Sequence, residues 1–310
     1  MSPVQVGIVW NPSKSEREEL EAAITGAEGF RFSWFETTKE DPGQGAARQA
    51  IEAGAELVVA AGGDGTVRAV AEHLAEAGAQ VELGIVPLGT GNLLARNLGI
   101  PLNDPAAAFE RMFSAEGRPV DVGWIDVASD GDTQRHAFTV MAGFGIDAHM
   151  ITETDDDLKE KAGWLAYVES LGRAVSASEV IDLELTDADG DAVHERAHTL
   201  LVGNCGVLQG GITLLPDAEP DDGELDVLVL RAEGLGGWLD SLRNLVWDNG
   251  LKRLIAQGER AESSHSTSHW RTTGLSVTLA EPRVIEVDGD DIGESTRLTV
   301  SIQPGALRVR

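Results

Sequence analysis

Apolar runs alternate with amphipathic segments over the first hundred residues of the chain. Runs typical of buried strands cover residues 4–10, 31–38, 55–65 and 81–92. Apolar residues recur at helical spacing over 11–24, 43–55, 66–78 and 93–99. Strands that alternate with helices predict a parallel sheet covered by helices, in which ligands bind beyond the carboxyl ends of the strands.

The pattern changes after about residue 120. Alternating apolar and polar residues, punctuated by Asp-Gly turns, predict strands within 135–150, 180–205, 224–233, 275–291 and 297–310. Such a pattern predicts an antiparallel β-sandwich-like or barrel domain. Two helical stretches interrupt it, at 157–175 and 236–258. In the second stretch, five apolar residues share one face of the predicted helix, and we expect this face to pack against the core rather than contact lipid: Trp238, Leu239, Leu242, Leu245 and Val246.

The 310 residues are more than one hydrophobic core usually serves. We therefore expect an α/β domain over residues 1–123 and a β-rich domain over 124–310, with the C-terminal strand free to return to the first domain. The predicted fold class is thus α/β plus all-β. No internal repeat or low-complexity linker interrupts this division.

The chain is strongly acidic, with 52 Asp and Glu residues against 24 Lys and Arg and a formal net charge of -28. This balance argues against nonspecific nucleic-acid binding and against electrostatic docking on an anionic membrane. The single cysteine, Cys205, excludes an intrachain disulfide and fits a reducing compartment. Residues 1–15 lack the basic segment of a signal peptide, and no stretch approaches the ~20 apolar residues of a membrane span. We expect a cytoplasmic protein.

Two glycine-rich loops follow neighbouring strands of the predicted parallel sheet. Gly62-Gly63-Asp64-Gly65-Thr66 opens a helix, and Gly89-Thr90-Gly91-Asn92 does so one strand–helix unit later. Glycine lets the backbone approach a ligand, and the N–H groups of a helix start favour phosphate. A plain tight turn explains the first loop equally well in isolation, and no Gly-Lys-[Ser/Thr] follows as in a Walker A loop. Together the loops predict one shared phosphate site.

These loops and six further segments resemble the diacylglycerol kinase catalytic-domain family, which includes bacterial lipid kinases and sphingosine kinases. The other matching segments are NPSKS (11–15), PVDVGW (119–124), AGFGIDA (142–148), LLVGN (200–204), LLPDAEPDDGELDV (214–227) and VDGDD (287–291). They keep the family's order over nearly the whole chain. The resemblance implies an ATP-dependent kinase with an N-terminal ATP-binding domain and a C-terminal domain that binds the lipid substrate and a metal.

The resemblance also implies roles for individual residues. One set of residues would contact the nucleotide phosphates or their metal: Asn11, Thr38 (or its neighbour Thr37), Gly62, Gly63, Asp64, Gly65, Thr66, Gly89, Thr90 and Asn92. It implies a charged trio that supports the site, formed by Lys14, Arg96 and Asp121. A lysine at a helix start is unfavourable toward the helix dipole, which favours a bound anion there over a merely solvent-facing Lys14.

An acidic turn at residues 216–227 is the candidate metal site. Asp217, Glu219 and Asp221 alternate somewhat like a calcium loop, but glycine at loop position seven and Leu228 at position twelve exclude an EF-hand. The resemblance implies Mg²⁺ bound by Glu219, Asp222 and the backbone carbonyl of Glu224. All are oxygen ligands, which Mg²⁺ prefers. An acidic hairpin without metal is the alternative.

Asp288-Gly289 by itself indicates a hairpin turn. The resemblance implies that Asp288 is the general base for the acceptor hydroxyl, with Asp290 in place of the family's glutamate. Two further departures are the missing glycine in NPSKS and Leu93, where many relatives have aspartate. On these assignments we expect Asp288→Asn to fold normally without activity, and Asp64→Ala to change stability little.

The leading hypothesis is a lipid kinase that moves the γ-phosphoryl group of ATP, with Mg²⁺, to a hydroxyl such as that of diacylglycerol. It would contact the membrane transiently and bind no nucleic acid; a homodimer is left open. One alternative is a sphingoid-base or other small-alcohol kinase of the same family. Another is a nucleotide-binding regulator without turnover, against which the presence of Asp64 and Asp288 speaks.

Overall fold

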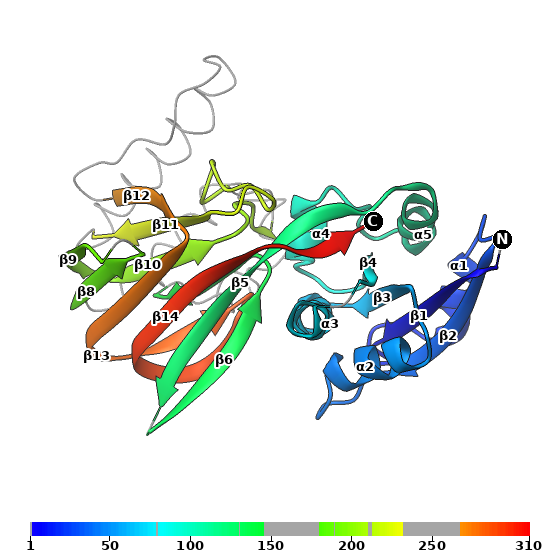
Figure 1. Cartoon of the computed structure of the whole chain (residues 1–310), viewed down its shortest axis with the longest axis horizontal. Coiled ribbons are helices and arrows are strands. Elements are labelled where there is room, and N and C mark those ends of the chain that lie inside the picture. The colour runs from blue at the N-terminus through cyan, green and yellow to red at the C-terminus, as the bar shows by residue number, and fades with distance from the viewer. Residues whose placement is uncertain are drawn as a thin grey trace, which may run out of the picture. The chain divides into compact units, whose positions relative to one another are not determined.

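The computed structural model describes residues 2–78, 80–129, 131–145, 180–188, 190–209, 213–231 and 267–310 (Figure 1). The helical stretches expected at 157–175 and 236–258 lie outside these residues. The chain forms two compact units. Unit 1 comprises Met1–Val122, Pro220–Asp222 and Gln303–Arg310, and unit 2 comprises Gly123–Glu219 and Gly223–Ile302. In the described part of the chain no helix is long and apolar enough to cross a membrane.

Unit 1 is built on a parallel sheet. Its strands are β1 (Val4–Trp10), β2 (Phe30–Glu36), β3 (Leu57–Gly62) and β4 (Glu82–Pro87), in the order β2-β1-β3-β4. The end of β14 (Asp290–Val309) extends this sheet beyond β4, where Val309 pairs with Leu83. Every residue of β3 is buried, as expected for a central strand covered on both faces.

Five helices connect and cover these strands. They are α1 (Arg17–Ala23), α2 (Gln44–Glu52), α3 (Asp64–Ala77), α4 (Leu93–Asn97) and α5 (Pro105–Ser114). Helix α2 packs against α3, and α1 against α5. Figure 1 shows α2 and α3 on one side of the strands and α5 on the other. The carboxyl ends of β3 and β4 therefore lead directly into the two glycine loops.

Unit 2 is dominated by antiparallel pairing. Its strands are β6 (Asp132–Phe138), β7 (Met141–Phe144), β8 (Ile181–Asp187), β9 (Ala192–Ala197), β10 (Thr199–Gly203), β11 (Leu225–Leu230), β12 (Thr267–Thr272), β13 (Gly274–Val287) and most of β5 (Arg118–Ser129) and β14. The order β12-β11-β10-β7-β13-β14 forms its main path; β8 pairs with β13 and β9 with β8, while β5 pairs with β14 and β6 with β5. The predicted combination of a parallel N-terminal sheet and an antiparallel C-terminal domain is confirmed.

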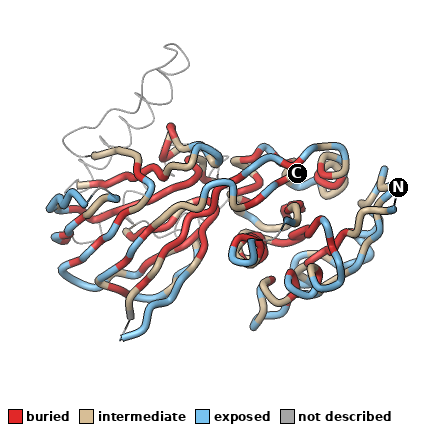
Figure 2. Tube along the Cα trace, in the orientation of Figure 1, coloured by how far each residue is buried: buried red, intermediate tan, exposed pale blue. Residues whose placement is uncertain are grey.

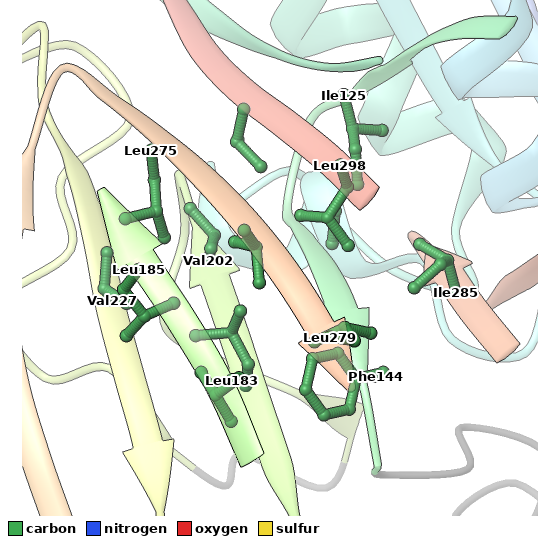
Figure 3. Packing of buried hydrophobic residues seen from close by; sticks show 14 of the residues in the cluster. Ile125, Phe144, Leu183, Leu185, Val202, Val227, Leu275, Leu279, Ile285 and Leu298 are labelled. Atoms are coloured by element: carbon green, nitrogen blue, oxygen red, sulfur yellow. The ribbon is translucent and has the colours of Figure 1, made fainter. Parts of the chain in front are cut away.

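Period-two patterning builds the core of unit 2. On β8, Ile181, Leu183 and Leu185 are buried, while the intervening Asp182 and Glu184 are exposed. Figure 3 shows Leu183 and Leu185 among side chains of β10, β11 and β13. Figure 2 shows the same alternation of buried and exposed positions along the strands. Strand β8 therefore contributes one apolar face to the core, whereas β10 and β11 are buried at every position.

Three elements were not predicted from the pattern: α5, β5 and β12. Helix α5 carries a recognisable start, because Asp104 accepts a hydrogen bond from Ala107 N at 3.0 Å and Pro105 occupies the first turn. The single run expected over 135–150 begins instead as two strands, β6 and β7. Thr139 and Val140 interrupt the ladder because their N–H groups bind a carboxylate.

Candidate functional site

The two glycine loops of unit 1 touch each other. A Cβ atom on Gly89 would lie 2.7 Å from Gly63 Cα, so only glycine fits at position 89 without displacing the other loop. At position 63 the backbone is extended, with φ -87°, and any side chain is conformationally allowed. The loops therefore meet at neighbouring strand ends, as expected. The backbone conformation at position 63 does not require glycine, so the absence of a side chain there matters for the room that it leaves next to the backbone.

Asp64 holds the second loop. Its Oδ2 accepts a hydrogen bond from Asn92 N at 2.8 Å, and its Oδ1 accepts one from Leu93 N at 2.6 Å. A Cβ on Gly91 would lie 2.8 Å from Asp64 Oδ2, so the contact is close. The carboxylate occupies the start of α4, where it satisfies exposed backbone donors. These bonds contradict the expectation that Asp64 supports little structure.

Asn92 completes the second loop from within. It has φ 48°, a left-handed conformation that asparagine tolerates better than most residues. Its Oδ1 accepts from Gly89 N at 2.9 Å, and its Nδ2 donates to Gly89 O at 2.7 Å. Asn92 therefore shapes the loop, and its predicted contact with the nucleotide stays a prediction.

The start of α3 fits a phosphate better than the start of α4, where the Asp64 carboxylate already accepts from the backbone N–H groups. This 14-residue helix begins at Asp64, and its N-cap, Gly63, provides no side-chain hydrogen bond. The Cε atom of Lys14 lies 4.0 Å from the position that a Cβ on Gly63 would take. A helix start, a glycine surface and a lysine next to it together fit a bound phosphate.

Lys14 is positioned by a tight turn after β1. Asn11 O accepts from Lys14 N at 3.0 Å, and Asn11 Oδ1 accepts from both Ser13 N and Ser13 Oγ, at 3.0 and 2.7 Å. The turn forms without the glycine that many relatives carry in this segment. Asn11 therefore shapes the lysine's turn, and its predicted contact with the nucleotide stays a prediction.

The remaining predicted residues of unit 1 divide by environment. Thr66 is buried beneath Gly62, and Thr37 is also buried, whereas Thr38 Oγ1 accepts from Asp41 N at 3.1 Å and Thr90 is exposed. Arg96 Nη2 donates to Gly91 O at 3.4 Å, at the second glycine loop. Asp121 is buried on β5, where its Oδ1 accepts from Gly305 N at 2.6 Å. The role of the charged trio stays a prediction.

In unit 2, Asp288 lies at the β13–β14 hairpin with its carboxylate directed inward. It has φ 48° and precedes Gly289 at φ 90°, as in the two-residue turns that Asp-Gly favours. Its Oδ2 accepts from Thr139 N and Thr139 Oγ1, and its Oδ1 accepts from Val140 N and Met141 N, all at 2.8–2.9 Å. The predicted Asp-Gly hairpin is thus confirmed, whereas the role of Asp288 as general base stays a prediction.

Asn204 joins the same segment from β10. Its backbone N donates to Val140 O at 2.8 Å, and its Nδ2 donates to Thr139 O at 3.2 Å. Both Asn204 and Thr139 are buried. Two of the segments that carried the family resemblance, VDGDD and LLVGN, therefore meet at the break between β6 and β7. Thr139 was missed from sequence, although it stands just before the AGFGIDA segment.

The residues of the acidic turn are divided between the two units, with residues 220–222 in unit 1 and the others in unit 2. Glu219 and Glu224 belong to unit 2 and Asp222 to unit 1, and both Glu219 and Asp222 are exposed. Gly223 has φ 77°, which allows the sharp turn. Within the described ranges no three His, Cys, Asp or Glu side chains gather as a metal site. The predicted set uses two side chains and one carbonyl, all oxygen donors, which fits Mg²⁺ in chemistry.

One buried histidine lies in unit 2, outside all predicted sites. His198, between β9 and β10, is 2% exposed, and its Nδ1 lies 2.7 Å from Thr199 Oγ1. Its Nε2 has no hydrogen-bond partner within the described ranges. Burial lowers the pKa of His198 from 6.5 to about 4, because the charged ring loses hydration.

Comparisons with known proteins agree with these motifs. A family model for the diacylglycerol kinase catalytic domain matches residues 8–125, and one for the YegS C-terminal NAD kinase beta sandwich-like domain matches residues 140–310. The chain is similar in fold to a solved structure of a diacylglycerol kinase from Bacillus anthracis strain Sterne. The TM-score is 0.69 at 21% identity, over 98% of this chain and 96% of that one.

Curated relatives extend the match to the full length. The chain is 34% identical over 316 residues to the "Probable lipid kinase YegS-like" of Pseudomonas aeruginosa strain UCBPP-PA14, covering 100% of this chain and 95% of the relative. It is 30% identical over 314 residues to the protein of the same name in Pseudomonas fluorescens strain Pf-5, covering 100% and 96%. The chain therefore belongs to the YegS-like lipid kinase family, whose catalytic domain is that of the diacylglycerol kinases.

Proposed function

We propose that this protein transfers the γ-phosphoryl group of ATP to the hydroxyl group of a lipid such as diacylglycerol. The observation that carries the proposal is the start of α3, where Lys14 and the two touching glycine loops surround backbone donors. Membership of a lipid kinase family supports phosphoryl transfer over simple nucleotide binding. Phosphoryl transfer needs positioning and charge neutralisation more than covalent chemistry, and this site supplies both.

At the nucleotide, each residue has a separate task. The start of α3 and Lys14 bind the phosphate charge, while Gly63 lets the phosphate reach the backbone. Asp64 and Asn92 keep the second loop in place through their hydrogen bonds to its backbone. The Mg²⁺ ion that accompanies ATP supplies further neutralisation of the phosphate charge.

In the reaction, the acceptor oxygen forms a bond to the γ-phosphorus while the bond between that phosphorus and the β–γ bridging oxygen breaks. ADP leaves with the bridging oxygen, and the acceptor proton passes to a carboxylate. We assign Asp288 to holding Thr139–Met141, because its four hydrogen bonds use the acceptor positions of an ionised carboxylate. We assign the proton to Asp290, an exposed carboxylate of the same hairpin.

The carboxylate assignment has a direct test. Asp290→Asn should lower the turnover of lipid by about 10²–10⁴-fold, as for the loss of a general base, with ATP affinity unchanged. Asp291→Asn is the matched control, because Asp291 is also exposed and, among the described residues, its carboxylate accepts from Gly293 N. If Asp290→Asn retains full turnover, the proton goes elsewhere.

The acceptor is tested with labelled ATP and an extracted lipid mixture, with the product identified by mass spectrometry. Defined diacylglycerol, a sphingoid base and a small alcohol then follow as separate acceptors. A phosphorylated lipid supports the proposal, and the preferred acceptor decides between diacylglycerol and the sphingoid-base alternative. ATP binding without transfer to any acceptor would favour the regulator instead.

We also propose that the protein works in the cytoplasm and contacts membranes transiently. The formal net charge of -28 opposes lasting attachment to an anionic surface. Cell fractionation should therefore leave most of the protein out of a salt-resistant membrane pellet. Recovery of most of it in that pellet would contradict the proposal.

A further inference from the structure

Arg271 connects the two ends of the acidic turn. On β12, its Nη2 donates to the carbonyl of Asp217, and its Nη1 lies 3.0 Å from Glu224 Oε2. These residues all belong to unit 2. One guanidinium group therefore holds the backbone at the start of the turn and a side chain at its end.

The same guanidinium is anchored in the sheet. Asp226 on β11 lies directly opposite Arg271 on β12, and Arg271 Nε is 3.7 Å from Asp226 Oδ2. The Asp226 carboxylate is 1% exposed and has a second neighbour, His269, whose Nε2 lies 3.0 Å from Oδ1. The buried carboxylate therefore attracts the guanidinium group of Arg271 as an ion pair, although no hydrogen bond joins the two side chains in the described structure.

The contact with Glu224 bears on the predicted ligand set. Glu224 was expected to contribute its backbone carbonyl to Mg²⁺ rather than its carboxylate. Its carboxylate is paired with Arg271, which is consistent with leaving the carbonyl for the metal. Arginine suits this position because its planar fork donates in several fixed directions, whereas lysine presents a single point charge.

We propose that Arg271 is a positioning residue for Mg²⁺ at the acidic turn: it holds the turn in the shape that presents the Glu224 carbonyl and the nearby carboxylates. The proposal rests on the proposed function and on the Mg²⁺ site that the family resemblance predicts at this turn. It does not depend on which lipid is the acceptor. It concerns the shape of the backbone, and not the charge that Arg271 carries.

The Mg²⁺ affinities of two Arg271 variants distinguish a role in shaping the turn from a purely electrostatic role. Replacement of arginine by lysine keeps the positive charge, so a purely electrostatic role predicts unchanged Mg²⁺ affinity for Arg271→Lys. Replacement by methionine removes a cation, so electrostatics alone predicts tighter Mg²⁺ binding. Positioning predicts weaker binding in both variants, because methionine donates no hydrogen bond and the compact ammonium group of lysine does not reproduce the planar fork that donates to Asp217 O and Glu224.

The matched control is Arg231→Lys. Arg231 directly follows β11 and is 25% exposed, against 28% for Arg271, and it also forms an ion pair within unit 2, with Glu195 on β9. It donates to Ser268 Oγ as well, at 2.6 Å, and belongs to neither end of the acidic turn. This variant should lose stability in a similar way and leave Mg²⁺ affinity at the wild-type value.

The experiment titrates Mg²⁺ alone, without nucleotide or lipid, against the full chain and follows binding by calorimetry and thermal unfolding. We expect Arg271→Lys to raise the Mg²⁺ concentration for half-saturation about tenfold, as for other residues that orient metal ligands. Wild-type affinity in Arg271→Lys, or an equal shift in Arg231→Lys, would overturn the proposal. Absence of Mg²⁺ binding by the wild type would also overturn it, while lipid phosphorylation by that same protein would show the proposed function intact.

Discussion

Asp288 Oδ2 accepts two hydrogen bonds from Thr139, one from the backbone N–H at 2.8 Å and one from Oγ1 at 2.9 Å. The other carboxylate oxygen accepts from Val140 N and Met141 N. These bonds join the β13–β14 hairpin to the break between β6 and β7. Since bonds to an ionised acceptor are stronger than neutral ones, the four together stabilise unit 2.

The first prediction is that Asp288→Asn destabilises the protein as well as lowering its activity. The amide offers one oxygen, so its NH₂ group must face at least one backbone donor that then has no acceptor. We expect a loss of about 1–3 kcal/mol in the free energy of unfolding, measured with denaturant. Thr139→Val, which removes only the hydroxyl, should cost about 1 kcal/mol. Wild-type stability in Asp288→Asn would restore Asp288 as a candidate general base.

The second prediction concerns Asp64. Asp64→Ala should cost about 1–2 kcal/mol, because Asn92 N and Leu93 N lose their shared acceptor, and it should also weaken ATP binding because the second loop loosens. Asp104→Ala is the matched control, since Asp104 caps α5 through Ala107 N. It should cost about 1 kcal/mol and leave ATP affinity unchanged. Equal effects of the two variants on ATP affinity would reduce Asp64 to an ordinary helix cap.

The third prediction separates two glycines of the site. A Cβ on Gly63 would approach Gly89 Cα to an ordinary 3.4 Å, so Gly63→Ala should fold with wild-type stability. It should nevertheless weaken ATP binding, because the methyl group covers the start of α3. Gly89→Ala should lose both stability and ATP affinity, since its Cβ would lie 2.7 Å from Gly63 Cα. Calorimetric ATP titration and thermal unfolding of both variants check this; unchanged ATP affinity in Gly63→Ala would move the phosphate away from this surface.

The sequence was informative where a local pattern determines the structure. The fully apolar β3 and the glycine loop after it indicated a parallel sheet with a site at its edge, and Asp288-Gly289 indicated a hairpin. The hydrogen-bond partners of the carboxylates could not be predicted from a local pattern. Asp64 reaches a residue 28 positions away and Asp288 reaches one 149 positions away, and neither local spacing nor composition reports such distances.

Missed elements have physical reasons of their own. Strand β5 carries the PVDVGW segment, but residues 120–125 are buried on both faces, Asp121 included, which obscures the alternation expected of a strand. Arg271 went unnoticed because its partners stand at separate positions along the chain, and only the pairing of β11 with β12 brings Asp226 opposite to it.

The last prediction is a pH dependence of stability that comes from His198. Its pKa is about 4 in the folded protein, against 6.5 for an unperturbed histidine, because burial disfavours the charged ring. The unfolded chain therefore binds the proton more readily. The contribution of the neutral ring to the free energy of unfolding is fully present above pH 6.5 and is lost as the pH falls toward 4, with a slope of up to about 1.4 kcal/mol per pH unit.

The variant His198→Asn tests this pH dependence, because asparagine keeps a polar group beside Thr199 and cannot titrate. Denaturant unfolding between pH 4.5 and 7.5 should show the wild type losing more stability than the variant as the pH falls, while carboxylates common to both cancel in the comparison. Parallel curves for the two proteins would mean that His198 takes up its proton in the folded state as easily as in the unfolded one.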